Sequence, residues 1–345
     1  MAPAAIQILV QLGPIPDFVW HYAVQNHQLN PQFATVLIAD AKAARPREGI
    51  SVVQFDTLVS TAELQELTLA LESSNIDPHW RKGYWLRIYG RFLALRNYCN
   101  QSGLDPGTPV IHLESDMANF ITEQLLDDSL REFNALNLMA FIDADTACPG
   151  VILSRTPAAM AMLCSTVLED VQGGRNRSDM KSLALAGSQL LQPLATLPEQ
   201  SKHTMQVRTA DANGVLSAEQ PASLIFDAAA VGQYLFGIDP RNQQGLLVPG
   251  YRETRGGLDP GLWQDWSLAL CQDGITRVTA RTQGRLLVLA NLHIHAKIII
   301  PRPEIGSDYW RTQLGIANGL IGARPQFVSQ SRLSQLIFRN LRRLS

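Results

Sequence analysis

The chain has 345 residues, of which 46% are apolar and 17% are charged. This composition excludes an intrinsically disordered chain and a small disulfide-stapled scaffold, and it supplies enough apolar side chains for a large buried core. The 29 Lys and Arg residues nearly balance the 31 Asp and Glu residues, which gives a formal net charge of -2. Such a balance gives no general attraction to nucleic acids or anionic membranes, so we expect no nucleic-acid partner.

The four cysteines are far apart in the sequence and include no C-x-x-C pair. We therefore expect buried thiols, because zinc sites and redox motifs need closely spaced cysteines. The N-terminal residues lack the basic region of a signal peptide, and no segment has the roughly 18 uninterrupted apolar residues of a membrane span. These features predict a cytoplasmic protein.

Runs of branched aliphatic residues alternate with helical patterns in the first half of the chain. Residues 6–12 are typical of a buried strand, Asp17 follows as the N-cap of a helix, and residues 34–39 predict a second strand. This spacing predicts an α/β fold of Rossmann-like type, with a mixed, mostly parallel sheet flanked by helices. Further along we expect strands over residues 50–55, 110–113, 136–142 and 151–153, and helices over residues 80–99, 127–133 and 157–171.

The second half of the chain has weaker periodicity. Residues 180–191 have a helical pattern, whereas residues 193–220 are rich in Pro, Gln and Thr and predict an irregular excursion. We expect one more helix over residues 228–236 and a last strand within residues 286–300.

A C-terminal extension over residues 311–345 is expected to follow a single domain over residues 1–310. Within it, residues 332–344 carry Leu and Ile at helical spacing, with four arginines elsewhere on the helix. Such a basic amphipathic helix can dock on the protein's own surface, or it can lie on anionic lipid at the inner face of the membrane. The sequence leaves both alternatives open.

An acidic triplet, Glu114, Ser115 and Asp116, directly follows the strand at residues 110–113. Ligands of open α/β sheets bind at the carboxyl ends of the strands, so these acids are expected to point into the binding crevice. Two carboxylates one residue apart can both reach a divalent cation. Acidic triplets are also common on solvated loops, so the motif alone leaves that alternative open. Asp143 and Asp145 form a second pair after an apolar run, but we favour the first pair because of the motifs that surround it.

Two histidines and a lysine alternate with other residues along the expected last strand. His293 and His295 share one face, where imidazoles could complete a metal coordination shell while Lys297 neutralises phosphate charge. The alternative is that both histidines lie on a half-buried strand, have hydrogen-bond partners within the protein and bind no metal. Two further acids, Asp179 and Asp227, each stand at the expected start of a helix, where the dipole favours the ionised form. Each of these two acids is either a plain N-cap or a group that takes part in the reaction.

Three motifs together carry a family resemblance. They are His112-Leu113-Glu114-Ser115-Asp116, the segment FDAAAVGQY at residues 226–234 with GIDPRN at residues 237–242, and NLHIHAK at residues 291–297. In order and spacing they resemble nucleotide-sugar glycosyltransferases of the GT-A type, over most of residues 5–300. Gln11, Gly13 and the helix that contains Arg91 look like the donor-side strand and helix of that group.

The resemblance implies a nucleotide-sugar donor whose diphosphate is bridged to the protein by Mn²⁺ or Mg²⁺. A UDP-sugar or a GDP-sugar is the favoured donor. Asp116, with Glu114, would hold the metal together with His293 or His295, and Lys297 would lie near the phosphates. Glu114 departs from the group's pattern, which has Asp there, so its carboxylate could contact the ribose instead.

The resemblance also implies transfer of a hexosyl unit to a glycan or lipid-linked acceptor, as in polysaccharide biosynthesis. In an inverting enzyme Asp227 or Asp179 would take the proton of the acceptor hydroxyl, and Asp227 is slightly favoured because it lies in the more distinctive motif. In a retaining enzyme either would position the substrate. Two alternatives stay open: a non-catalytic nucleotide- or carbohydrate-binding protein of the same fold, and a nucleotidyltransferase. The latter is expected to carry a glycine-rich phosphate loop, and residues 13–16 make a poor one.

Overall fold

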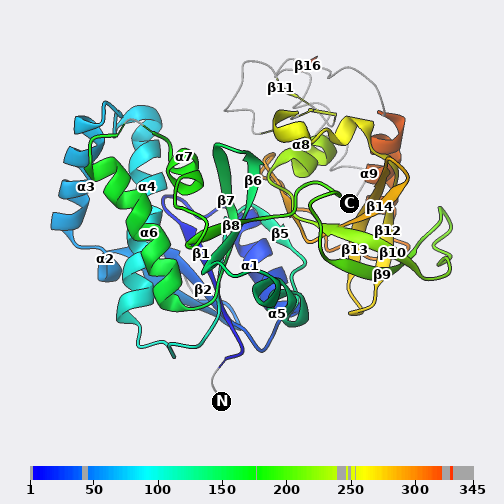
Figure 1. Cartoon of the computed structure of the whole chain (residues 1–345), viewed down its shortest axis with the longest axis horizontal. Coiled ribbons are helices and arrows are strands. Elements are labelled where there is room, and N and C mark those ends of the chain that lie inside the picture. The colour runs from blue at the N-terminus through cyan, green and yellow to red at the C-terminus, as the bar shows by residue number, and fades with distance from the viewer. Residues whose placement is uncertain are drawn as a thin grey trace. The chain divides into compact units, whose positions relative to one another are not determined.

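The computed structural model describes residues 3–40, 46–175, 177–238, 246–247, 250–252, 254–320 and 327–328. The chain divides into two compact units, Met1–Leu194 and Ala195–Ser345, which are called the first and second unit below. Figure 1 shows the elements of both units in chain order from blue to red.

A seven-stranded sheet forms the centre of the first unit, in the order β3-β2-β1-β4-β7-β6-β8. The four strands β3, β2, β1 and β4 run parallel, β7 is antiparallel to both of its neighbours, and β6 is parallel to β8. The expected mixed, mostly parallel sheet is therefore confirmed. The strands are β1 (Ile6–Gln11), β2 (Ala34–Ala39), β3 (Ile50–Gln54), β4 (Val110–Leu113), β6 (Asn137–Asp143), β7 (Thr146–Ser154) and β8 (Leu191–Leu194).

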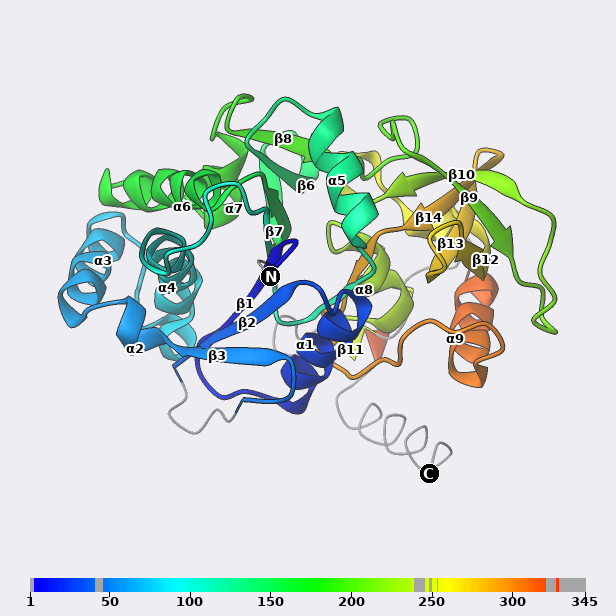
Figure 2. The ribbon, with the colours of Figure 1, turned by 90° about the horizontal axis from the view of Figure 1, so that it is seen from below.

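Helices cover both faces of this sheet. Figure 2 shows α4 and α6 on one face and α1 on the other. Three helices begin at sequence-encoded caps, since Ser60 and Glu63 form a reciprocal capping box at α3, Thr122 caps α5 and Thr156 caps α6. The helices are α1 (Asp17–Leu29), α2 (Phe55–Leu58), α3 (Thr61–Ser73), α4 (Trp80–Gln101), α5 (Glu123–Glu132), α6 (Pro157–Gln172) and α7 (Asp179–Ala184), and the short strand β5 (Met117–Asn119) follows β4.

The strand order reverses direction beside β1. From β1 the chain passes to β2 on one side and later returns to β4 on the other side. In open α/β sheets such a reversal opens a crevice at the carboxyl ends of the two strands. Here those ends are Gln11 on β1 and Leu113 on β4. The fold therefore places the residues that follow Gln11 and Leu113 where ligands of such sheets bind.

The second unit contains a closed five-stranded barrel in the order β10-β14-β13-β12-β9. β10 and β14 run parallel, and the other neighbouring strands of the barrel are antiparallel. The barrel strands are β9 (Thr204–Thr209), β10 (Gln220–Ile225), β12 (Gln264–Cys271), β13 (Thr276–Thr282) and β14 (Arg285–Leu289). The unit also contains α8 (Ala230–Phe236), β11 (Leu246–Leu247), two short 3-10 helices (Arg255–Gly257 and Pro260–Leu262), β15 (Asn291–His293), α9 (Asp308–Gly319) and β16 (Phe327–Val328).

Three features differ from the expectation. The helix expected over residues 180–191 is the short α7, and the chain then enters β8. The segment expected to be irregular, residues 193–220, contains the barrel strand β9, in which Met205 and Val207 are buried between polar residues. The expected boundary between residues 310 and 311 falls inside α9, because Trp310 and Leu314 bury one face of a continuous helix.

Two other expectations can be followed in the structure. All four cysteines are buried thiols, as expected. The basic segment at residues 332–344 lies outside the described residues. Across the part of the chain that the structure describes, no helix has both the length and the hydrophobicity to cross a lipid bilayer.

Candidate functional site

The carboxyl ends of β1 and β4 are joined by a side-chain hydrogen bond. Ser115, which follows β4, donates from Oγ to Oε1 of Gln11 at 2.8 Å. Gln11 in turn donates from Nε2 to the carbonyl oxygen of Pro14 at 2.9 Å, which fixes the loop after β1. The structure thus brings Gln11 and the acidic triplet together within the first unit.

Gly13 lies in this loop in a left-handed conformation, with φ at +101°. Its amide donates to Oδ1 of Asp40 at 2.7 Å. A Cβ atom at Gly13 would lie 3.3 Å from the guanidinium carbon of Arg87, so the glycine leaves room for that side chain. Sequence reasoning selected Gly13 and missed Arg87, although Arg87 stands four residues before Arg91 and so shares its face of α4.

Arg91 is a buried cation between two acids of the first unit. Its guanidinium pairs with the Glu114 carboxylate, and its second nitrogen lies 3.1 Å from Oδ2 of Asp179. The side chain is 7% exposed. Arg91 therefore connects α4 to the end of β4 and to the start of α7, and it brings together three residues that the sequence analysis selected separately.

The pKa values of these groups reflect a buried charge network. Burial acts to lower the pKa of Arg91, but the negative charges of Glu114 and Asp179 outweigh it, and the pKa of Arg91 is raised. Burial raises the pKa of Asp179, against the opposing charge of Arg91 and with a contribution from Glu114. Arg91 is thus a permanent cation, and Asp179 is a carboxylate that takes up a proton more readily than an exposed aspartate.

A tight turn holds Glu114 and Asp116. The Glu114 amide donates to the carbonyl oxygen of Gly150 on β7 at 2.9 Å, and the Met117 amide donates to the Glu114 carbonyl oxygen at 3.1 Å. Asp116, between them, is 5% exposed. By contrast, Asp145 of the alternative pair is exposed and donates its own amide to the Asp143 carboxylate at 3.0 Å, as a local hairpin contact.

Asp227 and His293 lie together in the second unit. The Asp227 side chain is 2% exposed, and its carboxylate accepts hydrogen bonds from the backbone amides of Val231, Gly232 and His293. Burial raises the pKa of Asp227, and the three backbone donors oppose that rise. Both oxygens of the Asp227 carboxylate thus accept hydrogen bonds from the protein's own backbone. This matters for Asp227 as a candidate base, because a base needs an oxygen that can accept the acceptor's proton.

The other two residues of the NLHIHAK motif differ in their surroundings. His295 is half-buried, and its ring lies against that of His293 with the centroids 4.3 Å apart. Lys297 takes up a left-handed conformation with φ at 53°, and its amide donates to the carbonyl oxygen of Ile294 at 2.8 Å. The motif thus begins as β15 and continues after His293 as a compact turn, so His295 and Lys297 lie beyond the strand on which they were expected.

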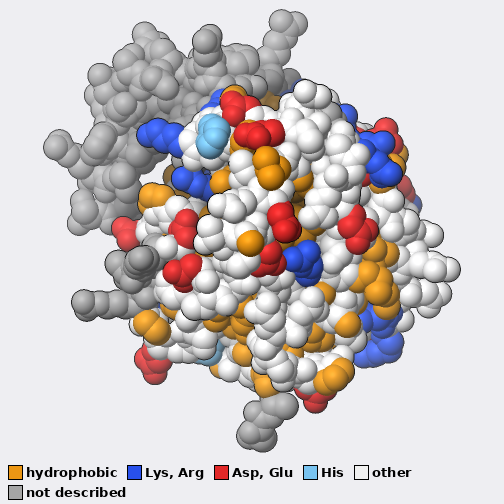
Figure 3. Space-filling model, turned by 90° about the vertical axis from the view of Figure 1, so that its left-hand side faces the viewer, with side chains coloured by type: hydrophobic (Ala, Val, Ile, Leu, Met, Phe, Trp, Pro, Cys, Tyr) orange, Lys and Arg blue, Asp and Glu red, His pale blue; other side chains and the backbone are white. Residues whose placement is uncertain are grey.

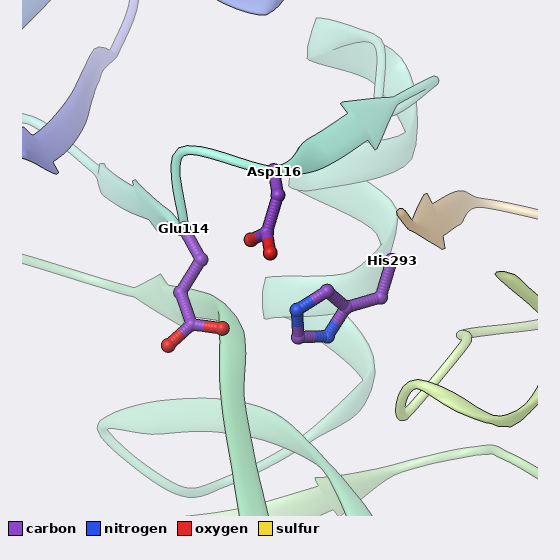
Figure 4. Close-up of side chains that lie close together, drawn as sticks. All are labelled: Glu114, Asp116 and His293. Carbon is purple, nitrogen blue, oxygen red and sulfur yellow. The ribbon is translucent and has the colours of Figure 1, made fainter. Parts of the chain in front are cut away.

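The described residues offer one group of His, Cys, Asp and Glu side chains of a kind that binds metal ions: Glu114, Asp116 and His293. Figure 4 shows these three side chains, the two acids beside the turn before β5 and the imidazole at β15. Two carboxylates and one imidazole are side chains of the kinds that ligate metal ions. His295, which the sequence could not separate from His293, is not in this group. A cavity of about 430 Å³ at the barrel contains none of the predicted site residues.

No protein-family model and no curated protein matches this chain. Among solved structures, the chain is similar to mouse Xyloside xylosyltransferase 1 in its apo form, at 12% identity and a TM-score of 0.36, over 55% of this chain and 85% of that chain. It is also similar to PaToxG Glycosyltransferase, at 10% identity and a TM-score of 0.32, over 55% of this chain and 67% of that chain.

Proposed function

We propose that this protein is a metal-dependent glycosyltransferase of GT-A type that uses a nucleotide-sugar donor. The observation that carries the proposal is the arrangement at the carboxyl ends of β1 and β4. There Gln11 binds Ser115, and the acids on either side of Ser115 leave the strand beside the buried cation Arg91. A crevice at this position is where α/β folds bind nucleotides, and paired acids beside it supply ligands for the metal of a diphosphate.

Glu114, Asp116 and His293 are proposed to bind one divalent ion, Mn²⁺ or Mg²⁺. This requires the two acids of the first unit and the imidazole of the second unit to ligate the same ion. The ion, when bound, neutralises the diphosphate that leaves the sugar. Lys297 follows His293 by four residues and is proposed to add a positive charge beside the phosphates, because an ammonium group is a compact partner for them.

Asp179 is proposed as the acid that faces the acceptor. In an inverting reaction its carboxylate takes the proton of the acceptor hydroxyl, and in a retaining reaction it positions the sugar. Asp227 is the less suitable of the two candidates, because its oxygens already accept three backbone hydrogen bonds. The raised pKa of Asp179 suits a base better than that of an exposed aspartate.

The donor is proposed to be a UDP- or GDP-hexose, and the acceptor a glycan or lipid-linked saccharide of polysaccharide biosynthesis. Cytoplasmic location, with contact between the basic segment at residues 332–344 and the inner face of the membrane, belongs to the same proposal. Such a contact would suit a lipid-linked acceptor, since enzyme and substrate would then meet at one surface.

A thermal-shift titration tests the proposal. The full chain is heated with UDP-, GDP-, CMP- and dTDP-sugars, each with and without Mn²⁺, since a ligand that binds only the folded state raises the Tm. We expect a rise that needs both one nucleotide sugar and Mn²⁺, that is lost in D116A, and that persists in the matched control D145A. A rise that D116A retains and D145A loses would move the metal site to Asp143 and Asp145. No rise with any donor would contradict the proposed donor class.

A further inference from the structure

The Asp227 carboxylate binds two separate stretches of backbone in the second unit. Oδ1 accepts from the Val231 amide and Oδ2 from the Gly232 amide, both at 2.8 Å, at the start of α8. Oδ2 also accepts from the His293 amide at 3.0 Å. One side chain therefore ties the first turn of α8 to the backbone of a residue that follows 66 positions later.

Asn291 adds a second connection between the same two stretches. The Asp227 amide donates to Oδ1 of Asn291 at 3.1 Å, and Nδ2 of Asn291 donates to the Asp227 carbonyl oxygen at 3.1 Å. Both residues are buried. Because Asn291 stands two residues before His293, this reciprocal pair sets the register of β15 against the chain around Asp227.

Gly232 lets α8 approach His293 more closely than any other residue would. A Cβ atom at Gly232 would lie 1.9 Å from the carbonyl oxygen and 3.1 Å from the amide nitrogen of His293. The first distance is far below van der Waals contact. Position 232 therefore needs glycine because there is no space for a side chain beside the His293 backbone. The glycine of the FDAAAVGQY motif is thus explained by the backbone of the NLHIHAK motif.

The His293 backbone is bonded at both of its polar groups. Its amide donates to Asp227, and its carbonyl oxygen accepts from the His295 amide at 3.0 Å. The His295 ring lies beside the His293 ring. Because the backbone of His293 is already ordered, its imidazole can bind a ligand with little loss of backbone entropy.

We infer that Asp227 is a positioning residue, which with Gly232 fixes the backbone of His293 so that the imidazole is held ready for the metal. The inference rests on the proposed function, because it takes His293 as a metal ligand. It explains why an acid whose two oxygens both bind backbone amides stands in the most distinctive motif of the chain. Groups that orient a metal ligand typically change metal affinity 10- to 100-fold when they are substituted.

Binding of Mn²⁺ alone to the full chain tests the inference, with free Mn²⁺ counted by electron paramagnetic resonance. In D227N the new amide nitrogen has no lone pair for a backbone donor, so we expect Mn²⁺ affinity to fall about 10- to 100-fold. G232A is expected to weaken binding at least as much, because its Cβ displaces His293. The double variant that combines D227N with G232A should bind Mn²⁺ about as weakly as G232A alone, since both changes act on the same backbone.

D273N is the matched control. Asp273 pairs with the buried Arg277 in the same unit, with 2.6 Å between the closest atoms, and this ion pair lies at the turn between β12 and β13. Its loss should lower the Tm while leaving Mn²⁺ affinity unchanged. If D227N loses no more Mn²⁺ affinity than D273N at a similar loss of Tm, the role of Asp227 is structural only, and the inference is overturned.

A third variant separates this inference from the proposed function. H293A should lose Mn²⁺ binding if His293 is a ligand, and unchanged binding in H293A would refute the metal proposal itself. Weak binding in H293A together with full binding in D227N and G232A would refute the positioning role alone. Should D227N fail to fold, N291S offers a milder change at the same connection, and undiminished Mn²⁺ binding there would overturn the inference.

Discussion

The Arg91 guanidinium lies between the carboxylates of Glu114 and Asp179, in contact with both. One cation thereby balances two acids whose close approach would otherwise be unfavourable in a buried site. Because Arg91 is buried, its charge is poorly screened by solvent, and the pair interactions depend on good geometry. The orientation of Glu114 at the end of β4 thus depends on a residue of α4 that is 23 positions away in sequence.

Removing Arg91 should cost stability as well as binding. In R91M the buried Asp179 and the partly buried Glu114 lose their partner, and breaking such a network costs about 3–5 kcal/mol of the free energy of unfolding. Urea unfolding measures this loss in the free energy of unfolding. The matched control is R96M on the same helix, because Arg96 pairs with Glu63 at a half-exposed position and its loss should cost about 1 kcal/mol or less. Equal losses in the two variants would contradict the network.

Gly13→Ala is expected to weaken donor binding. The substitution brings a Cβ atom to 3.3 Å from Arg87 and strains a left-handed backbone, the strain costing about 1 kcal/mol. Gly174→Ala separates the two effects, because Gly174 has φ at +73° with nothing within 4 Å of its Cβ position. Both variants should lose similar stability in urea, and only G13A should show a higher Kd for the nucleotide sugar by calorimetry. A raised Kd in G174A as well would mean that strain alone explains the effect.

Asp179 is buried, so its substitution can disturb the docking of α7 as well as the reaction. The prediction for Asp179 therefore needs a control for docking. If Asp179 accepts the acceptor's proton, D179N should lower kcat about 10²- to 10⁴-fold while Mn²⁺ affinity stays within a few-fold of the original protein. D170N is the control for docking of α7, because Oδ2 of Asp170 accepts from Ser182 of that helix at 2.6 Å. Steady-state rates with the donor identified by thermal shift provide the measurement. A full rate in D179N would exclude it as the base.

Part of this site was readable from the sequence because its residues directly follow hydrophobic runs. β1 and β4 are short, apolar and buried, so their ends and the acids after β4 could be placed before the structure. The pairing of Arg91 with Asp179 could not, because the two lie 88 residues apart and meet only in the folded first unit, where Arg91 of α4 contacts the first residue of α7. The backbone hydrogen bonds of the Asp227 carboxylate were also hidden, since an N-cap and a base have the same sequence pattern.

The barrel escaped prediction for a different reason. In β9 the buried Met205 and Val207 alternate with more exposed Gln, Arg and Thr residues, and in β13 an Arg and a Thr are themselves buried. Neither strand therefore contains the continuous apolar run that marks β1 or β2. Arg277 on β13 is buried and pairs with Asp273, which no apolar pattern would indicate. On the face of the molecule in Figure 3, acidic and basic side chains are interspersed, in keeping with the small net charge of the whole chain.

His112 predicts a loss of stability in acid. Its ring lies fully buried on β4, with Nδ1 3.1 Å from the carbonyl oxygen of Ile8. Burial lowers the pKa of His112 to about 3, with the charge of Arg91 acting in the same direction. The unfolded chain, with an ordinary pKa near 6.5, binds this proton at a pH where the folded chain does not. The free energy of unfolding should therefore fall by up to about 1.4 kcal/mol per pH unit as the pH drops from about 6.5 toward 3.

Urea unfolding between pH 7 and pH 4.5 measures this contribution. H112Q keeps a side chain that can donate to the Ile8 carbonyl oxygen and removes the titrating group, so its stability should depend less on pH by about 1 kcal/mol per unit in the lower part of this window. H21Q is the control, because His21 lies on α1 and is half-exposed. The same pH dependence in H112Q as in the original protein would show that His112 is not the group responsible. A reduced dependence in H21Q would transfer the effect to the other histidine.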